Sequence, residues 1–194
     1  MPTELAHDPR PALSRALDQA GKQVAAVTPD ELSNRTPCAE YDVRALLGHM
    51  VSVLHKLIRV GTGQGARDVP EVIDDIADDS WTSTFTLARS EVEQVWADDE
   101  QLDRMITLPW ATLPGRDVLE AYAHEFTAHS WDLAHATRRL AELDPDLATR
   151  ALEAFTKFAP PEDRSQQGPF GPVVTVPDDA GVYTRLAAYL GRRP

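Results

Sequence analysis

Hydrophobic residues recur at helical intervals along almost the whole chain. The first stripe, which includes Leu13, Leu17 and Val24, predicts a helix over residues 11–27 that ends before Pro29. A second stripe predicts a helix from Asp42, a residue type favoured at helix N-termini, to about residue 60. The same periodicity predicts three further helices, over residues 118–140, from residue 145 to about 158, and from about 182 to 190.

Three segments fit this pattern less well. Residues 69–97 predict a long acidic helix with a break near residues 78–80, where a fresh helix could start. Residues 105–113 alternate only briefly and contain Pro109, so we expect an extended crossover there. Residues 173–176, Val-Val-Thr-Val, form one strand-like run near the carboxyl end. The pattern as a whole predicts an all-α protein.

Length, composition and charge indicate the number of domains and the classes of partner that the protein can bind. A chain of 194 residues with 42% hydrophobic residues fits a single ordered domain over 1–194, with residues 160–194 as a C-terminal extension. The chain has 31 acidic against 19 basic residues, a net charge of -12, which repels phosphate backbones and anionic lipids. We therefore expect no nucleic-acid partner and no membrane partner.

Cysteine usage and the N-terminus indicate the compartment. The single cysteine, Cys38, has no intramolecular partner for a disulfide, and no basic and apolar signal pattern opens the chain. No segment approaches the roughly 20 apolar residues that cross a bilayer. These features predict a soluble, cytoplasmic protein.

One carboxylate stands where the pattern predicts an apolar residue. On a helical wheel of residues 118–140, Glu125 and His129 fall within the apolar face and stack one turn apart. Burying an unpaired carboxylate costs on the order of several kcal/mol, so a positive charge must compensate it. A divalent cation bound by both side chains compensates that charge, and His49, at the flank of the second stripe, is the candidate third ligand.

This two-histidine, one-glutamate set leaves coordination positions open, which is typical of catalytic metal sites. The alternative is a metal-free core ion pair between Glu125 and His129, hydrogen-bonded to a tyrosine or tryptophan. Asp132, three residues after His129, could orient a ligand imidazole. Cys38 could act as a soft ligand or a redox thiol, but a small, buried, inert cysteine is the simpler interpretation, because nothing nearby in sequence would lower its pKa. We expect His124 and His135 on the flank or surface of their helix.

Two segments carry a resemblance to a known family. Residues 36–49 (TPCAEYDVRALLGH) and 125–137 (EFTAHSWDLAHAT) resemble the DinB-like superfamily, in particular the actinobacterial branch that shares the metal-binding domain of mycothiol-dependent maleylpyruvate isomerase. The carboxyl end, residues 172–192, also resembles that branch. Tyr41 stands where the family commonly has tryptophan, and Arg138 where it commonly has glycine. The isomerase itself carries a larger C-terminal domain.

The resemblance implies a DinB-like four-helix bundle that holds a divalent metal, Zn²⁺ first and Ni²⁺ second, on His49, Glu125 and His129. It further implies a zinc-dependent thiol transferase or isomerase that takes mycothiol as co-substrate together with an electrophilic substrate, and it allows a homodimer. Two other functions stay open: a non-catalytic metal-binding stress or sensing protein, and a metal-free helical interaction module.

Overall fold

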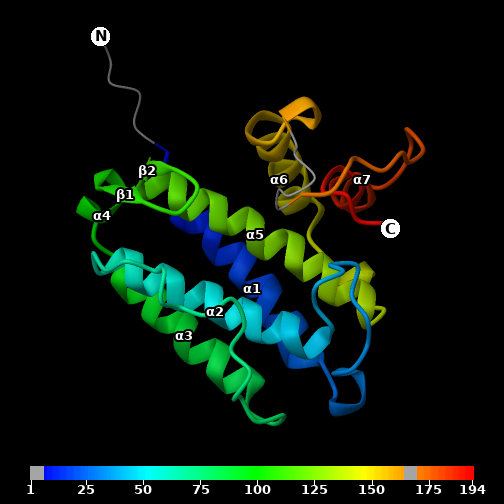
Figure 1. Cartoon of the computed structure of the whole chain (residues 1–194), viewed down its shortest axis with the longest axis horizontal. Helices are drawn as coiled ribbons and strands as arrows, with labels where there is room; N and C mark the ends of the chain where they lie inside the picture. The colour runs from blue at the N-terminus through cyan, green and yellow to red at the C-terminus, as the bar shows by residue number, and fades with distance from the viewer. Residues whose placement is uncertain (1–6, 164–169) are drawn as a thin grey trace.

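Four helices pack around a common core in the computed structural model, which describes residues 7–163 and 170–194. They are α1 (Arg10–Ala26), α2 (Val43–Gly61), α3 (Trp81–Val95) and α5 (Gly115–Ala136). Helix α1 packs along α5 and α3, and α2 packs along the same two helices (Figure 1). The contacts therefore close into a four-helix bundle, and the predicted all-α class is confirmed.

The predicted helix ends are explained by capping and by backbone geometry. The Asp42 carboxylate accepts a hydrogen bond from the backbone N–H of Ala45 at 2.8 Å, which caps α2 as predicted. Helix α5 ends at Ala136, four residues earlier than predicted, because Arg138 adopts a left-handed conformation with φ of 61°. Arg139 then donates its backbone N–H back to the carbonyl of Ala134 at 2.7 Å, which closes the helix end.

The remaining elements lie at the two ends of the bundle and on the outer side of α5 (Figure 1). Near the start of α5, the segment predicted as an extended crossover forms an antiparallel hairpin in which Ile106 pairs with Leu113. Residues 173–176, the strand-like run, lie in a segment without regular secondary structure, where Val174 donates its N–H to the carbonyl of Ala188 at 2.9 Å. These elements are η1 (Pro29–Glu31), α4 (Glu100–Asp103), β1 (Met105–Thr107), β2 (Thr112–Pro114), η2 (Leu140–Glu142), α6 (Pro145–Phe158), η3 (Pro161–Asp163) and α7 (Val182–Tyr189).

The long acidic helix predicted over residues 69–97 is shorter than expected. Only Trp81–Val95 is helical, and residues 62–80 form an irregular crossover that runs over α2. Ile73 donates its backbone N–H to the carbonyl of Gly48, and the Ser52 hydroxyl donates to the carbonyl of Pro70. The crossover thus satisfies part of its backbone hydrogen bonding on α2 instead of forming its own helix. Gly48 allows this approach, because a Cβ atom there would collide with the carbonyl oxygen of Ile73.

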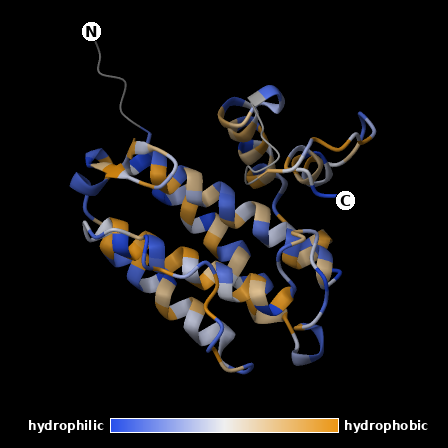
Figure 2. Cartoon of the chain, in the orientation of Figure 1, coloured by the Kyte–Doolittle hydropathy of each residue, from blue (hydrophilic) through white to orange (hydrophobic). Residues whose placement is uncertain are grey.

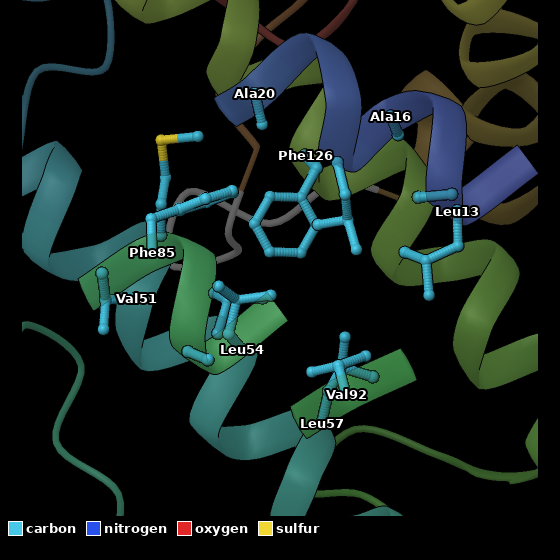
Figure 3. Packing of buried hydrophobic residues seen from close by; sticks show 14 of the residues in the cluster. Leu13, Ala16, Ala20, Val51, Leu54, Leu57, Phe85, Val92 and Phe126 are labelled. Carbon is cyan, nitrogen blue, oxygen red and sulfur yellow. The ribbon is translucent and has the colours of Figure 1, made fainter. Parts of the chain in front are cut away.

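The core of the bundle is built from the apolar stripes of all four helices. Phe126 of α5 lies between α1 and the side chains of α2 and α3, and its ring centroid is 6.2 Å from that of Phe85 (Figure 3). A second, smaller cluster joins α6 and α7 to α5 through Ala128, Phe155 and Leu186. Helices of the bundle carry both hydrophobic and hydrophilic residues along their length (Figure 2). Within the described ranges, no helix is both long enough and apolar enough to cross a membrane.

Candidate metal centre

The three predicted ligand residues come together between α2 and α5. The Nε2 atoms of His49 and His129 each lie 3.3 Å from the same oxygen, Oε1 of Glu125. The two imidazole rings meet edge to face, with centroids 5.0 Å apart. One ligand atom from each of the three side chains lies within 4.8 Å of the others. Residues that are 76 positions apart in the chain therefore face one point in the structure.

The outward nitrogen of His49 is held by the crossover between α2 and α3. Its Nδ1 lies 2.9 Å from the backbone carbonyl oxygen of Glu71, which can only accept a hydrogen bond. The ring of Tyr41 stacks on the imidazole with centroids 4.9 Å apart. A ring that donates this hydrogen bond from Nδ1 leaves Nε2, the nitrogen that faces Glu125, as the atom available to a metal.

The outward nitrogen of His129 is held by a buried carboxylate. Its Nδ1 lies 3.0 Å from Oδ2 of Asp132, a residue that is fully buried. Arg192, just after α7, donates from Nε to Oδ1 and from Nη2 to Oδ2, both at 2.8 Å. His129 therefore has the same arrangement as His49, with Nδ1 engaged by an acceptor and Nε2 directed at Glu125.

Exposure differs sharply among the three side chains. The side chains of His49 and His129 retain only 8% of their accessible surface, whereas Glu125 retains 35%. The two imidazoles are therefore largely enclosed by packing, whereas the Glu125 side chain keeps part of its surface in contact with solvent.

The ionisable groups of the centre shift each other in opposite directions. Burial opposes the charge of Glu125, but the charge and hydrogen bonds of His129 and His49 outweigh it and hold the pKa of Glu125 well below its usual range. Burial likewise opposes the charge of His129, yet the carboxylates of Glu125 and Asp132 raise its pKa to about 9. Without a metal, the centre is thus an ion-pair network with a cationic His129 between two carboxylates.

A second group of metal-compatible side chains lies next to the first. Cys38, His129 and Asp132 also bring ligand atoms within 4.8 Å of one another. Both oxygens of Asp132 are already engaged by the Arg192 guanidinium, so a cation there would meet a fixed positive charge. Burial raises the pKa of Cys38 to about 11, against the opposing charge of Arg192, so the thiol is neutral near pH 7. This second group therefore suits a metal poorly.

The donor set of His49, Glu125 and His129 does fit a divalent cation. It offers two imidazole nitrogens and one carboxylate oxygen, the ligand types that zinc takes in sites with an open position. Both imidazoles have their other nitrogen hydrogen-bonded to an oxygen acceptor, which is the usual support of a metal-bound histidine.

Two other histidines of α5 lie away from this centre. His124, which we expected on the flank or surface, is instead buried beside Phe155, with ring centroids 6.1 Å apart. Among the described residues, its Nε2 has no hydrogen-bond partner. His135 is half-buried and lies against Trp131 at 5.1 Å between centroids. Neither side chain belongs to a group that could hold a metal within the described ranges.

Two groups that support the centre were not predicted from the sequence. The carbonyl of Glu71 belongs to a segment that we expected to be helical, and a main-chain acceptor leaves no residue-type signal. Arg192 lies 60 residues from Asp132, and nothing in its local sequence connects the two. The one sequence signal in that region is that residues 186–192 resemble the carboxyl end of related proteins.

Comparison with known proteins places these residues in a family context. A family model described as the mycothiol maleylpyruvate isomerase N-terminal domain matches residues 13–134, which include His49, Glu125 and His129. Two uncharacterized proteins of Mycobacterium tuberculosis, from strains CDC 1551 / Oshkosh and ATCC 25618 / H37Rv, are each 29% identical over 186 residues. Each alignment covers 95% of this chain and 98% of the relative. No solved structure matches the chain significantly.

Proposed function

Because the chain belongs to the family of the mycothiol maleylpyruvate isomerase N-terminal domain, we propose that it is a metal-dependent enzyme that uses a small-molecule thiol. His49, Glu125 and His129 would hold a divalent cation, with Zn²⁺ as the first choice. The thiol would be mycothiol or a close relative, as the name of the family suggests, and the reaction would be S-transfer or isomerisation of an electrophilic substrate.

One observation carries this proposal: two buried imidazoles direct their Nε2 atoms at one carboxylate oxygen, while an oxygen acceptor holds each Nδ1. A simple ion pair requires one histidine for one glutamate. It does not require a second imidazole whose Nδ1 is also held by an oxygen acceptor and whose Nε2 faces the same carboxylate oxygen. That arrangement is what a cation with three protein ligands needs.

The exposure of the ligands indicates where a substrate would bind. Bound Zn²⁺ lowers the pKa of a thiol in its coordination sphere and favours the nucleophilic thiolate. The buried imidazoles hold their positions, and the exposed side of Glu125 is the side from which the thiol and the electrophile can approach. The half-buried ring of Tyr41, stacked on His49, lies beside this approach and would limit access of water.

Metal content tests the first part of the proposal. Untagged protein from a zinc-supplemented culture should contain about one zinc per chain by elemental analysis, since three protein ligands suffice for a catalytic site. The Glu125→Gln variant, which keeps the side-chain shape but lacks the charge, and His49→Ala should both lose it. His55→Ala, on the same helix but outside the ligand set, is the matched control. Stoichiometric zinc in His49→Ala would refute this site.

Cobalt substitution tests the second part and separates the alternatives. Added thiol should change the visible absorption of the Co²⁺ form, because sulfur would enter the coordination sphere. A Co²⁺ spectrum that ignores thiols would indicate a metal-binding protein without thiol chemistry, such as a sensing protein. Absence of any bound metal in the wild type would leave the helical interaction module and reduce Glu125 and His129 to a buried pair.

A further inference from the structure

Arg192 lies outside the residues that the family model matches, yet it reaches the centre through one intermediate residue. It follows α7, and its side chain retains 11% of its accessible surface. Its guanidinium donates to both oxygens of the fully buried Asp132, whose Oδ2 also lies 3.0 Å from Nδ1 of His129. A continuous chain of hydrogen bonds therefore runs from the C-terminal extension to a candidate ligand.

We propose that Arg192 is a positioning residue of this centre: it orients the Asp132 carboxylate, which in turn holds the His129 imidazole with Nε2 directed toward Glu125. The inference rests on the proposed metal site, because it assigns Arg192 a role in the affinity of that site. It gives the C-terminal extension a part in building a centre whose three ligands all belong to the helical bundle.

The chemistry of Asp132 requires such a partner. A fully buried carboxylate needs compensation for the loss of water, and one imidazole hydrogen bond leaves most of its acceptor capacity unused. The planar guanidinium occupies both oxygens at once, which fixes the plane of the carboxylate as well as its position. Since the same plane determines where Oδ2 meets His129, Arg192 controls the orientation of the ring indirectly.

The backbone around Arg192 is itself fixed. Gly191 adopts a φ of 83°, and a Cβ atom on it would lie 2.6 Å from Cα of Gly171, so the two glycines pass in close contact. The backbone N–H of Arg192 donates to the carbonyl of Ala187 at 2.9 Å. The guanidinium is therefore presented by an anchored segment and not by a loose end of the chain, which is what a positioning role demands.

Metal affinity tests the inference in variants of the full chain. Competition with a chromophoric chelator should show that Arg192→Ala binds Zn²⁺ about ten-fold or more weakly than the wild type, the usual effect of losing such support. Arg192→Lys should fall between them, because an ammonium keeps the charge but cannot match both oxygens of Asp132. Arg193→Ala, which alters the exposed neighbouring arginine, should bind as the wild type does. Unchanged affinity in both Arg192 variants would overturn the inference.

A second measurement, on metal-free protein, separates this inference from the proposed function. In ¹⁵N-labelled protein the proton on Nδ1 of His129 should exchange slowly with water, and measurably faster in Arg192→Ala, because Asp132 is then no longer held in place. If the wild type binds no Zn²⁺, the proposed function fails, and this exchange rate alone decides whether Arg192 positions His129. Equal exchange rates in the wild type and the variant would contradict the positioning role. Should Arg192→Ala fail to fold, as judged by thermal unfolding, both measurements rest on Arg192→Lys.

Discussion

At the scale of single residues, His124 and His129 lie five positions apart on α5, and both are buried, yet their surroundings move their pKa values in opposite directions. Burial lowers the pKa of His124 to about 4, with a smaller contribution from Arg150. His129 is equally buried, but two carboxylates raise its pKa to about 9. What faces each imidazole, and not the depth of burial, determines its charge near pH 7.

The lowered pKa of His124 predicts a loss of stability in mild acid. Below about pH 6.5 the unfolded chain binds a proton at this residue that the folded chain does not bind until about pH 4. Folding stability from His124 is therefore complete above pH 6.5 and declines as the pH falls toward 4. Between pH 7.5 and pH 5, we expect the free energy of unfolding to fall by about 2 kcal/mol more in the wild type than in His124→Leu, because leucine cannot bind this proton.

Urea unfolding of both proteins at several pH values, in the presence of a chelator, measures this difference. The comparison cancels the titration of other groups, because both proteins share them. Stability curves that stay parallel from pH 7.5 to pH 5 would show that His124 does not resist protonation in the folded state.

Among the residues of the centre, the sequence predicted the side chains that share a helical face. Glu125 and His129 stand out because they interrupt an apolar stripe, and that position on the face was visible from spacing alone. His49 was the candidate third ligand because it lies at the flank of the second stripe, and the family resemblance implied the same residue. No local pattern connects the two helices. The carbonyl of Glu71 and the Arg192 guanidinium could not be predicted, because both depend on how distant segments pack.

At the scale of elements, Gly48 on α2 is where the crossover of residues 62–80 packs against the bundle. A methyl group on Gly48 would strike the carbonyl of Ile73, two residues after the Glu71 carbonyl that holds His49. Gly21 on α1 is different, because a Cβ atom there would meet only the Phe85 ring at 3.5 Å, an ordinary contact. Gly48 and Gly21 therefore offer a matched comparison: both lie inside helices, but only Gly48 lacks room for a methyl group.

We expect Gly48→Ala to destabilise the protein by about 1–3 kcal/mol, the usual result of forcing atoms into a packed contact. It should also weaken Zn²⁺ binding, because displacement of the crossover removes the acceptor from Nδ1 of His49. Gly21→Ala should be stabilising by roughly 0.5–1 kcal/mol through helix propensity, with unchanged metal affinity. Denaturant unfolding and chelator competition measure both effects; equal behaviour of the two variants would contradict the packing role of Gly48.

The helices themselves were predictable to within a few residues because their hydrophobic periodicity is strong. The crossover was not predicted, since its polar and acidic composition is compatible with helix and nothing local prevents one. Its actual path is set by contacts with α2 that involve main-chain atoms. The hairpin of β1 and β2 was missed for a similar reason: each strand has only three residues, too few for alternation to be distinctive.

At the scale of the whole molecule, the candidate centre connects parts of the chain that are far apart in sequence. Its ligands lie on α2 and α5, and its supports lie in the crossover and after α7. The relatives align over 95% of this chain, so the alignment extends beyond the helical bundle. Loss of the centre should therefore lower the stability of the whole fold.

Metal binding should accordingly raise the melting temperature. A ligand that binds only the folded state adds about 2.7 kcal/mol at a hundred-fold excess over Kd, which for a chain of this size corresponds to about 5–10 °C. We expect this increase for the wild type on addition of Zn²⁺, its reversal by chelator, and no increase for Glu125→Gln. Scanning calorimetry measures all three, and an equal Zn²⁺ response in Glu125→Gln would show that the ion binds elsewhere.

The unequal exposure of the three candidate ligands also bears on the rate at which a bound ion would exchange. Two imidazoles with 8% of their surface exposed are held by packing and by their outer hydrogen bonds, while the carboxylate of Glu125, with 35% exposed, is the ligand with room to move. Ion exchange would then begin with rotation of this one side chain. All three side chains would contribute to affinity, and the movement of the glutamate would determine how fast a bound ion leaves.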